Sequence, residues 1–287
     1  MTRAATLALL FTILTFGGCN PAMPDRVNVH TREMVTENRT YYVRSDGADT
    51  NDCLSDSPGG ACRTWGRAVQ LVNQIDFGGK IVTIKHGEEA SPVTFTEQLY
   101  LTGMTGGGEL HIRGSSTPGH TVFSATSGDI IGLRSVITPV HLWDMTFDGG
   151  GSHIMVAYLS TVNLRDGLVF GPASFAHILV HDAQAMLIDV SVSTSITGSA
   201  PYHVFSNGGS AFIEYGEKAL IGMPEFAAYL GIMNGGRIQT VGMEFVGTAT
   251  GARYWVVGNS VLNAFNSGPN YLPGSLPGNA IDGGLYR

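Results

Sequence analysis

One set of polar and aromatic residues recurs through the second half of the chain and could do chemistry. Its members follow one another at intervals of 24 to 26 residues: Asp129, His153, His177, His203, Tyr229 and Arg253. Imidazole and phenol rings can stack on sugar rings and hydrogen-bond to sugar hydroxyl groups. If these side chains share one exposed face, the set predicts recognition of a polysaccharide.

Catalysis is less well supported by the same residues. A glycosidase needs two carboxyl groups within about 5–9.5 Å, and a lyase needs acidic calcium ligands and a base in one groove. Asp129 and Arg253 have suitable charges, but they would lie five coils apart, about 24 Å at roughly 4.8 Å per coil. Asp148, in the loop before His153, is the remaining carboxylate near Asp129. Asp129, Asp148 and His153 are therefore weak catalytic candidates.

The histidines are also weak metal ligands. Two nitrogens on one zinc ion lie at most about 4.2 Å apart, so rings on coils roughly 4.8 Å apart would have to converge. The sequence has no CxxC pair, phosphate-binding loop or GxSxG elbow. We expect no metal and no cofactor.

The elements that must position these residues are short strands in a repeat. Clear copies are VHLWDMTFDGG from Val140, VNLRDGLVFG from Val162 and RIQTVGMEFVG from Arg237. A period of 22 to 27 residues predicts a solenoid. We expect an all-β, single parallel β-helix of about eight coils over residues 80–262. Each coil is marked by one strand: Ile81–Ile84, Leu110–Ile112, Ile130–Leu133, Ile154–Val156, Ile178–Val180, Val204–Ser206, Leu230–Ile232 and Tyr254–Val256.

Alternation along these strands sets the expected faces. With residues such as Ile154 and Val156 inside, the histidine set points outward. A second outward stripe lies two residues further on: Met155, Leu179, Phe205, Gly231 and Trp255. The predicted ligand-binding residues are His153, His177, His203, Tyr229, Arg253 and Trp255. The apolar stripe could equally be buried against another copy, and a slip of one residue in register would exchange the faces.

A third column stands at a turn between strands: Asp144, Asp166, Asp189, Gly216 and Gly242. Stacked aspartates could form a calcium site or a carboxylate pair. Asp and Gly also suit turns, because both tolerate left-handed backbone or bond their own backbone. We favour a structural turn ladder.

An amphipathic helix precedes the repeat. Trp65, Ala68, Val69, Val72 and Ile75 share one helical face, and Thr64 stands at the N-cap position. A helix here would cover the open apolar end of the first coil. Just before it, Cys53 and Cys62 flank a turn and could form a disulfide or remain free thiols.

The N-terminal segment predicts export. Residues 1–19 contain one Arg, an apolar run too short to span a bilayer, and Gly-Gly before Cys19, which resembles a secretory signal with a lipoprotein cleavage site. A mis-assigned start codon is the alternative. We expect a linker at 20–39, a strand, cysteine loop and capping helix at 40–79, and a C-terminal cap or tail at 263–287.

Composition agrees with a strand solenoid and excludes one partner class. The chain has 39 glycines and only 14% charged residues, against roughly 25% in typical soluble domains. Its net charge is −7 with no run of Lys or Arg. Nucleic-acid binding depends on clustered cations that release counterions, so we expect no nucleic-acid partner.

Three longer motifs suggest relatives: TREMVTENRTYYVRSDGADTND, SAPYHVFSNGG, and ATGARYWVVGNSVLN followed by GPNYLPG. The organisation resembles the right-handed parallel β-helix of the pectate-lyase-like superfamily, and more closely tail fibre or tail spike-like β-helix proteins of phages and prophages of alphaproteobacteria. The resemblance covers roughly residues 30–287. Members of that group lack a signal peptide and the two cysteines, so an exported relative is implied.

We therefore expect an exported or surface-exposed, tail spike-like protein that recognises a polysaccharide or cell-surface glycan without strong catalysis. The alternatives are a polysaccharide lyase or glycoside hydrolase, and a purely structural or adhesive protein. Expected locations are secreted, outer-membrane or cell-surface lipoprotein, or phage virion. A lipid at Cys19 would be the membrane contact, and a homo-oligomer such as a trimer is compatible with the apolar stripe.

Overall fold

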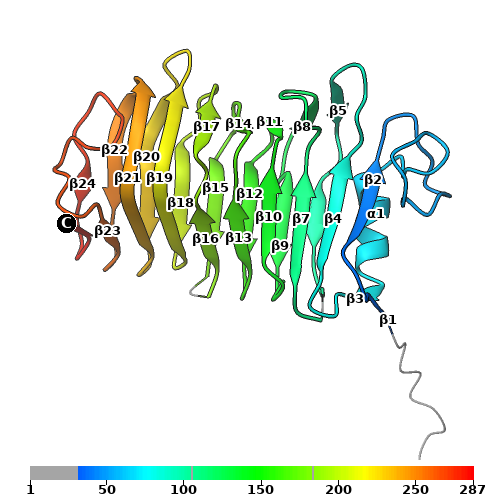
Figure 1. Ribbon diagram of the computed structural model, residues 1–287. Coiled ribbons are helices and arrows are strands. Elements are labelled where there is room, and N and C mark those ends of the chain that lie inside the picture. Colours follow the sequence, from blue (N-terminus) through cyan, green and yellow to red (C-terminus); the bar gives the residue numbers. More distant parts are fainter. Residues whose placement is uncertain (1–31, 105, 183) are drawn as a thin grey trace, which may run out of the picture. The chain divides into compact units, whose positions relative to one another are not determined.

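The computed structural model describes residues 32–104, 106–182 and 184–287. The predicted signal, Cys19 and most of the predicted linker lie outside these residues. From Arg32 onward the chain forms one parallel β-solenoid of about eight coils, with β2 (Arg39–Val43) and α1 (Trp65–Val72) at one end and the C-terminus at the other (Figure 1). The prediction of an all-β solenoid with one helix is confirmed.

Each complete coil contributes one strand to each of three faces, and the paired strands are parallel. The first face contains β2 (Arg39–Val43), β4 (Ile81–His86), β7 (Glu109–Arg113), β10 (Val140–Trp143), β13 (Thr161–Leu164), β16 (Met186–Asp189), the first halves of β19 (Ser210–Leu220) and β21 (Arg237–Gly247), β23 (Val261–Asn263) and β25 (Leu285–Tyr286). The second face contains β5 (Val93–Phe95), β8 (Thr121–Ala125), β11 (Thr146–Gly149), β14 (Leu168–Phe170), β17 (Ser193–Ile196) and the second halves of β19 and β21.

The third face contains β6 (Leu99–Leu101), β9 (Ile131–Arg134), β12 (Ser152–Ala157), β15 (Ala176–His181), β18 (Tyr202–Asn207), β20 (Glu225–Met233), β22 (Thr250–Val256) and β24 (Asn279–Ala280). One detail of the coil numbering is corrected. Ile81–Ile84 and Leu110–Ile112 belong to the first face, whereas the strands from Ile130 onward belong to the third.

The interior is built from columns of like residues that stack from coil to coil. On the second face Phe95, Phe123, Phe147 and Phe170 are Cα partners in successive strands, and all are buried. Neighbouring rings lie 5.6–6.3 Å apart. Fully burying one such side chain contributes about 1.5–3 kcal/mol, so a repeated apolar position stabilises every coil against the next.

Helix α1 (Trp65–Val72) closes the first coil as predicted. Thr64 is its N-cap, and its hydroxyl accepts a hydrogen bond from the Arg67 amide at 3.1 Å. Trp65 is fully buried, with its ring 5.7 Å from that of Phe95. The helix ends before Ile75, which lies in β3 (Ile75–Asp76) and pairs with β1 (Glu33–Met34).

The cysteine loop beside the helix is cross-linked. Cys53 and Cys62 form a disulfide with their Cα atoms 4.8 Å apart, and both are fully buried. Cys62 also bridges to Val43 at the end of β2. The disulfide therefore fixes the loop to the first coil.

The predicted turn column is correct in part. Asp144, Gly216 and Gly242 have φ values of 56°, 91° and 61°, in the left-handed region that Gly adopts without cost. The Asp166 carboxylate accepts hydrogen bonds from two backbone amides of the next coil. Asp189 does not belong to the column.

Asp189 occupies an interior column instead. Its Cα partners are Leu164 on one side and Ile213 on the other, and it is 3% exposed. Counting residues between turns misplaced it, because strand register and not turn spacing decides which side chains point inward.

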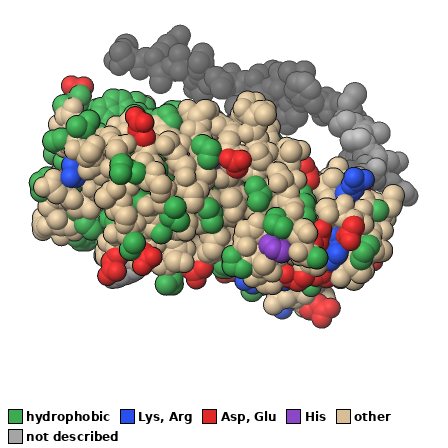
Figure 2. Space-filling model, turned by 90° about the horizontal axis from the view of Figure 1, so that it is seen from above, with side chains coloured by type: hydrophobic (Ala, Val, Ile, Leu, Met, Phe, Trp, Pro, Cys, Tyr) green, Lys and Arg blue, Asp and Glu red, His purple; other side chains and the backbone are tan. Residues whose placement is uncertain are grey.

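The outer surface carries few charges. On the face in Figure 2, uncharged polar side chains and backbone predominate, and charged side chains are scattered singly or in small groups. This agrees with the low charged fraction of 14%.

Candidate functional site

The histidine set lies inside the solenoid, so its predicted outward orientation is wrong. His153 and His177 are fully buried, and His203 and Tyr229 are 2% and 1% exposed. The His153 ring stacks 5.5 Å from Phe147 of the core. These four residues therefore form no surface stripe, and their predicted ligand-binding role is withdrawn because it rested on exposure.

The error has a local cause in strands β12, β15 and β18. Strict alternation would place His153 and Ile154 on opposite sides of the strand. In the structure both are buried, and Ile154 belongs to the core; the outward side of the strand resumes at Met155, which lies outside the core cluster although it is only 3% exposed. In each of these three strands the histidine and the residue after it both point inward, and this pair interrupts the alternation of inward and outward side chains.

The buried rings form a continuous column. His153 and His177 stack with centroids 5.1 Å apart, and His203 and Tyr229 with centroids 5.0 Å apart. The Nδ1 atoms of His177 and His203 lie 3.0 Å apart, so one donates and the other accepts. Burial lowers the pKa of His153 to about 4 and that of His203 to about 3. The rings are neutral at pH 7 and act as core residues.

A charged pair lies beside this column. Lys218 Nζ is 2.9 Å from Asp189 Oδ2 and donates to Ser191 Oγ at 2.6 Å. Lys218 is fully buried, and its positive charge contributes to the lowered pKa of His203, after burial itself. Interior charges of this kind require a partner, and each here has one.

The weak catalytic candidates do not form a site. His153 Nε2 lies 3.0 Å from the Pro172 carbonyl inside the solenoid. Asp148 is exposed near the end of β11 on the second face, and Asp129 precedes β9 on the third. Burial raises the pKa of Asp129, opposed by hydrogen bonding to Ser152. Ile131 pairs with Ile154, so Ile130, not Asp129, aligns with His153.

The second predicted stripe, in contrast, is an outward column of the third face. Its residues are successive Cα partners: Met155, Leu179, Phe205, Gly231 and Trp255. Tyr202 stands in the neighbouring outward column, with its ring 4.6 Å from Phe205. The rings of Tyr202 and Trp255 are 6.5 Å apart and within 18° of parallel. At this end of the stripe Tyr202 and Trp255 are partly exposed, whereas Phe205 is only 6% exposed.

Glycine makes this ring arrangement possible. A Cβ atom on Gly231 would lie 2.6 Å from both the Phe205 and the Tyr202 rings, closer than van der Waals contact allows. The same holds at Gly132, where a Cβ would lie 2.8 Å from Tyr100. At both positions a ring lies against the glycine backbone; Tyr100 and Tyr202 are partly exposed there, whereas Phe205 is buried.

The rings border a hollow that we call the third-face groove. Its volume is about 390 Å³, and its lining is Tyr202, Ala227, Ala228, Ala252, Tyr254, Trp255, Leu276, Pro277 and Asn279. Arg253, a predicted ligand residue, does not line it. Its guanidinium donates to the Leu276 carbonyl at 2.9 Å and supports the segment that forms one wall.

A second group of functional side chains lies on the first face, and sequence reasoning missed it. We call it the first-face cluster, and it consists of Glu109, His111, Arg113, His141, Trp143 and Arg165. His111 and His141 are Cα partners in β7 and β10. Their Nε2 atoms lie 2.8 and 3.4 Å from Glu109 Oε2. Two imidazoles and a carboxylate around one point are a common metal-binding set.

The surroundings of His141 favour hydrogen bonding over metal binding. Arg165 Nη2 and Nε lie 3.1 and 3.3 Å from His141 Nδ1. A guanidinium only donates, so Nδ1 accepts and the ring proton is on Nε2, facing Glu109. A metal-bound histidine has the opposite arrangement, with the free pair on the ligating nitrogen and the other nitrogen donating. The cluster fits a relay of donors from Arg165 to the Glu109 carboxylate.

The electrostatics of the cluster follow from this geometry. The hydrogen bond from His111 lowers the pKa of Glu109, and burial lowers that of His141 to about 4. Arg113 and Arg165 lie against the Trp143 ring, 5.1 and 5.9 Å from its centroid. The residues of the first-face cluster come from three coils, and no short sequence motif contains them all.

No family model, curated protein or solved structure matches this chain. Among the residues that the structure describes, no helix has the length and apolar character needed to cross a membrane.

Proposed function

We propose that this protein is an exported, tail spike-like β-solenoid that recognises a polysaccharide through its third-face groove. One observation carries the proposal: the rings of Tyr202 and Trp255 are nearly parallel and partly exposed, and they line the groove together with the small side chains of three alanines. Aromatic faces beside a few hydrogen-bonding groups are the usual means of holding a sugar ring.

The groove suits an uncharged sugar best. Its lining contains no Asp, Glu, Lys or Arg. The polar side-chain groups of the lining are the Tyr202 and Tyr254 hydroxyls, the Trp255 indole N–H and the Asn279 amide. These can bond hydroxyl groups without requiring an ionic partner.

The solenoid adds a reason to expect a polymer. Successive coils present outward positions roughly 4.8 Å apart along the axis, and Tyr100 on β6 belongs to the same outward column as Trp255, through Gly132 and Met155. A glycan chain lying along this column would meet several coils. A secreted, cell-surface or virion location is part of the proposal.

Binding to a glycan array tests it. The protein, with Trp255→Ala and Tyr202→Ala variants, is applied to neutral polysaccharides, and positive glycans are titrated by calorimetry. Each variant should lose about fivefold or more in affinity, since one ring contributes roughly 1–3 kcal/mol. Exposed Phe265→Ala, outside the groove, is the control and should bind normally. Unchanged affinity in both groove variants would remove the proposal.

A second copy covering the same rings is the rival explanation, because an exposed apolar strip often marks an interface. Sedimentation velocity separates the two. A groove covered by another copy predicts an oligomer that Trp255→Ala dissociates, whereas a glycan site predicts the same mass for both proteins.

A further inference from the structure

The cations of the first face differ in whether they have a partner. Near the N-terminal end, Lys85 pairs with Glu88 at 2.8 Å and Arg113 lies 3.6 Å from Asp144. The Arg165 guanidinium donates a hydrogen bond to His141 Nδ1. At the other end of this face, Arg237 and Arg287 are exposed and form no ion pair with any carboxylate that the structure describes.

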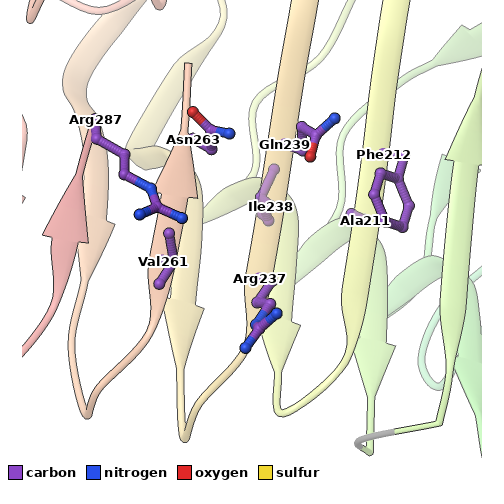
Figure 3. Close-up of a pocket in the computed structure, with 8 residues that line it drawn as sticks. All are labelled: Ala211, Phe212, Arg237, Ile238, Gln239, Val261, Asn263 and Arg287. Carbon is purple, nitrogen blue, oxygen red and sulfur yellow. The ribbon is translucent and has the colours of Figure 1, made fainter. Parts of the chain in front are cut away.

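These two arginines border a small hollow on β19, β21 and β23, which we call the C-terminal pocket. Its volume is about 200 Å³, and it is lined by Ala211, Phe212, Arg237, Ile238, Gln239, Val261, Asn263 and Arg287. Phe212, Gln239 and Asn263 are Cα partners, and Arg287 follows in the next coil. In Figure 3 the Gln239 and Asn263 amides are level with each other, the Arg287 guanidinium lies between Asn263 and Val261, and the Arg237 guanidinium lies further down, at the start of β21.

The amides are available as donors beside the arginines. Asn263 Oδ1 accepts a hydrogen bond from the Phe265 amide at 3.2 Å, so its NH2 group is left for another acceptor. Gln239 is half-buried and stands one coil away from Asn263, with Arg237 two residues before it on the same face. The pocket lining thus carries two guanidinium groups and two side-chain amides, together with the apolar side chains of Ala211, Phe212, Ile238 and Val261.

We propose that the C-terminal pocket binds a single acidic group, a carboxylate or a sulfate, of a ligand lying on the first face. Guanidinium groups bond such oxyanions in pairs of charge-assisted hydrogen bonds. The volume is below the roughly 300–1,000 Å³ of sites that enclose whole small molecules, so the pocket takes one group and not a complete ligand. The site is separate from the third-face groove and does not depend on it.

Calorimetric titration at low salt with sodium glucuronate, sodium sulfate and glucose tests the proposal. Glucuronate or sulfate should bind saturably in the millimolar range, and uncharged glucose should not. Arg237→Gln and Arg287→Gln should each weaken binding by about tenfold, as expected for one hydrogen bond to a charged group, and the double variant should abolish it. Arg63→Gln, an exposed arginine near the helix, is the matched control and should bind normally.

The anion that binds identifies the acidic group. If neither anion binds the unmodified protein, or if the double variant binds as well as the unmodified protein, the proposal is wrong. Trp255→Ala, which tests the groove, should leave anion binding unchanged. The two proposals can therefore fail independently, and circular dichroism confirms that each variant is folded.

Discussion

Replacing Lys218 by Met should strongly destabilise the protein, because it leaves the Asp189 carboxylate buried without its cation. Both side chains are almost inaccessible, at 0% and 3% exposure, and their charged atoms are 2.9 Å apart. Breaking a buried pair on one side typically costs about 3–5 kcal/mol. The two hydrogen bonds that Ser191 donates to the Asp189 carboxylate should offset only part of this loss of stability.

Replacing both members should cost much less. Asp189 stands between Leu164 and Ile213 in an interior column, so Leu fits the position, and Met approximates the length of Lys218. Apolar replacements of whole buried pairs are often neutral or stabilising by about 1–4 kcal/mol. The Ser191 and Thr194 hydroxyls, 2.7 Å apart, can still bond to each other.

Urea unfolding of the unmodified protein, Lys218→Met, Asp189→Leu and the double variant gives the full cycle. We expect a coupling free energy of about 3 kcal/mol or more between the two positions. A double variant as unstable as the sum of the single variants would show that the pair is not coupled. A Lys218→Met loss below about 1 kcal/mol would refute the argument that burial dominates.

Three further predictions follow from buried groups and close contacts. His153 and His203 have folded-state pKa values lowered to about 4 and 3, against about 6.5 when unfolded. Their contribution to stability is therefore complete above pH 6.5 and is lost as pH falls from 6.5 to about 4 for His153 and to about 3 for His203, by up to about 1.4 kcal/mol per pH unit for each ring. Urea unfolding from pH 7 to pH 5 should show this slope, and His153→Phe should reduce it by one ring's share; an unchanged slope would contradict the assignment. Gly231→Ala should weaken binding in the third-face groove, because the added Cβ would displace the partly exposed Tyr202 ring and the buried Phe205 ring, and it should lower the free energy of unfolding by about 1–3 kcal/mol; equal glycan titrations would argue against the ring geometry. Removing the disulfide with Cys53→Ser should lower the free energy of unfolding by about 2–4 kcal/mol. An unchanged midpoint in urea would show that the disulfide does not stabilise the loop.

Much of the fold could be predicted from the sequence because its signals are local and repeated. A strand is marked by alternation, and a coil by the return of the same pattern after 22 to 27 residues. Identical positions of a parallel solenoid stack on one another, so a repeated Phe or Ile necessarily meets its own kind. The capping helix was equally predictable from the spacing of Trp65, Ala68, Val69 and Val72, with Thr64 before them.

The candidate sites needed the tertiary structure. The third-face groove combines a predicted residue, Trp255, with Tyr202, whose column was not recognised. The first-face cluster joins residues such as Glu109, His141 and Arg165 from three coils, and only the observed register brings them together. Because the coils differ in length, no local sequence pattern predicts which residues of neighbouring coils lie side by side.

The histidine column shows the division most clearly. The sequence by itself determined that His153, His177, His203 and Tyr229 would stack, since they recur once per coil. It could not determine the side of the sheet, because a single break in alternation before Ile154 turns these rings inward. Packing against Phe147 and its neighbours decides that orientation, and packing is a property of the folded solenoid.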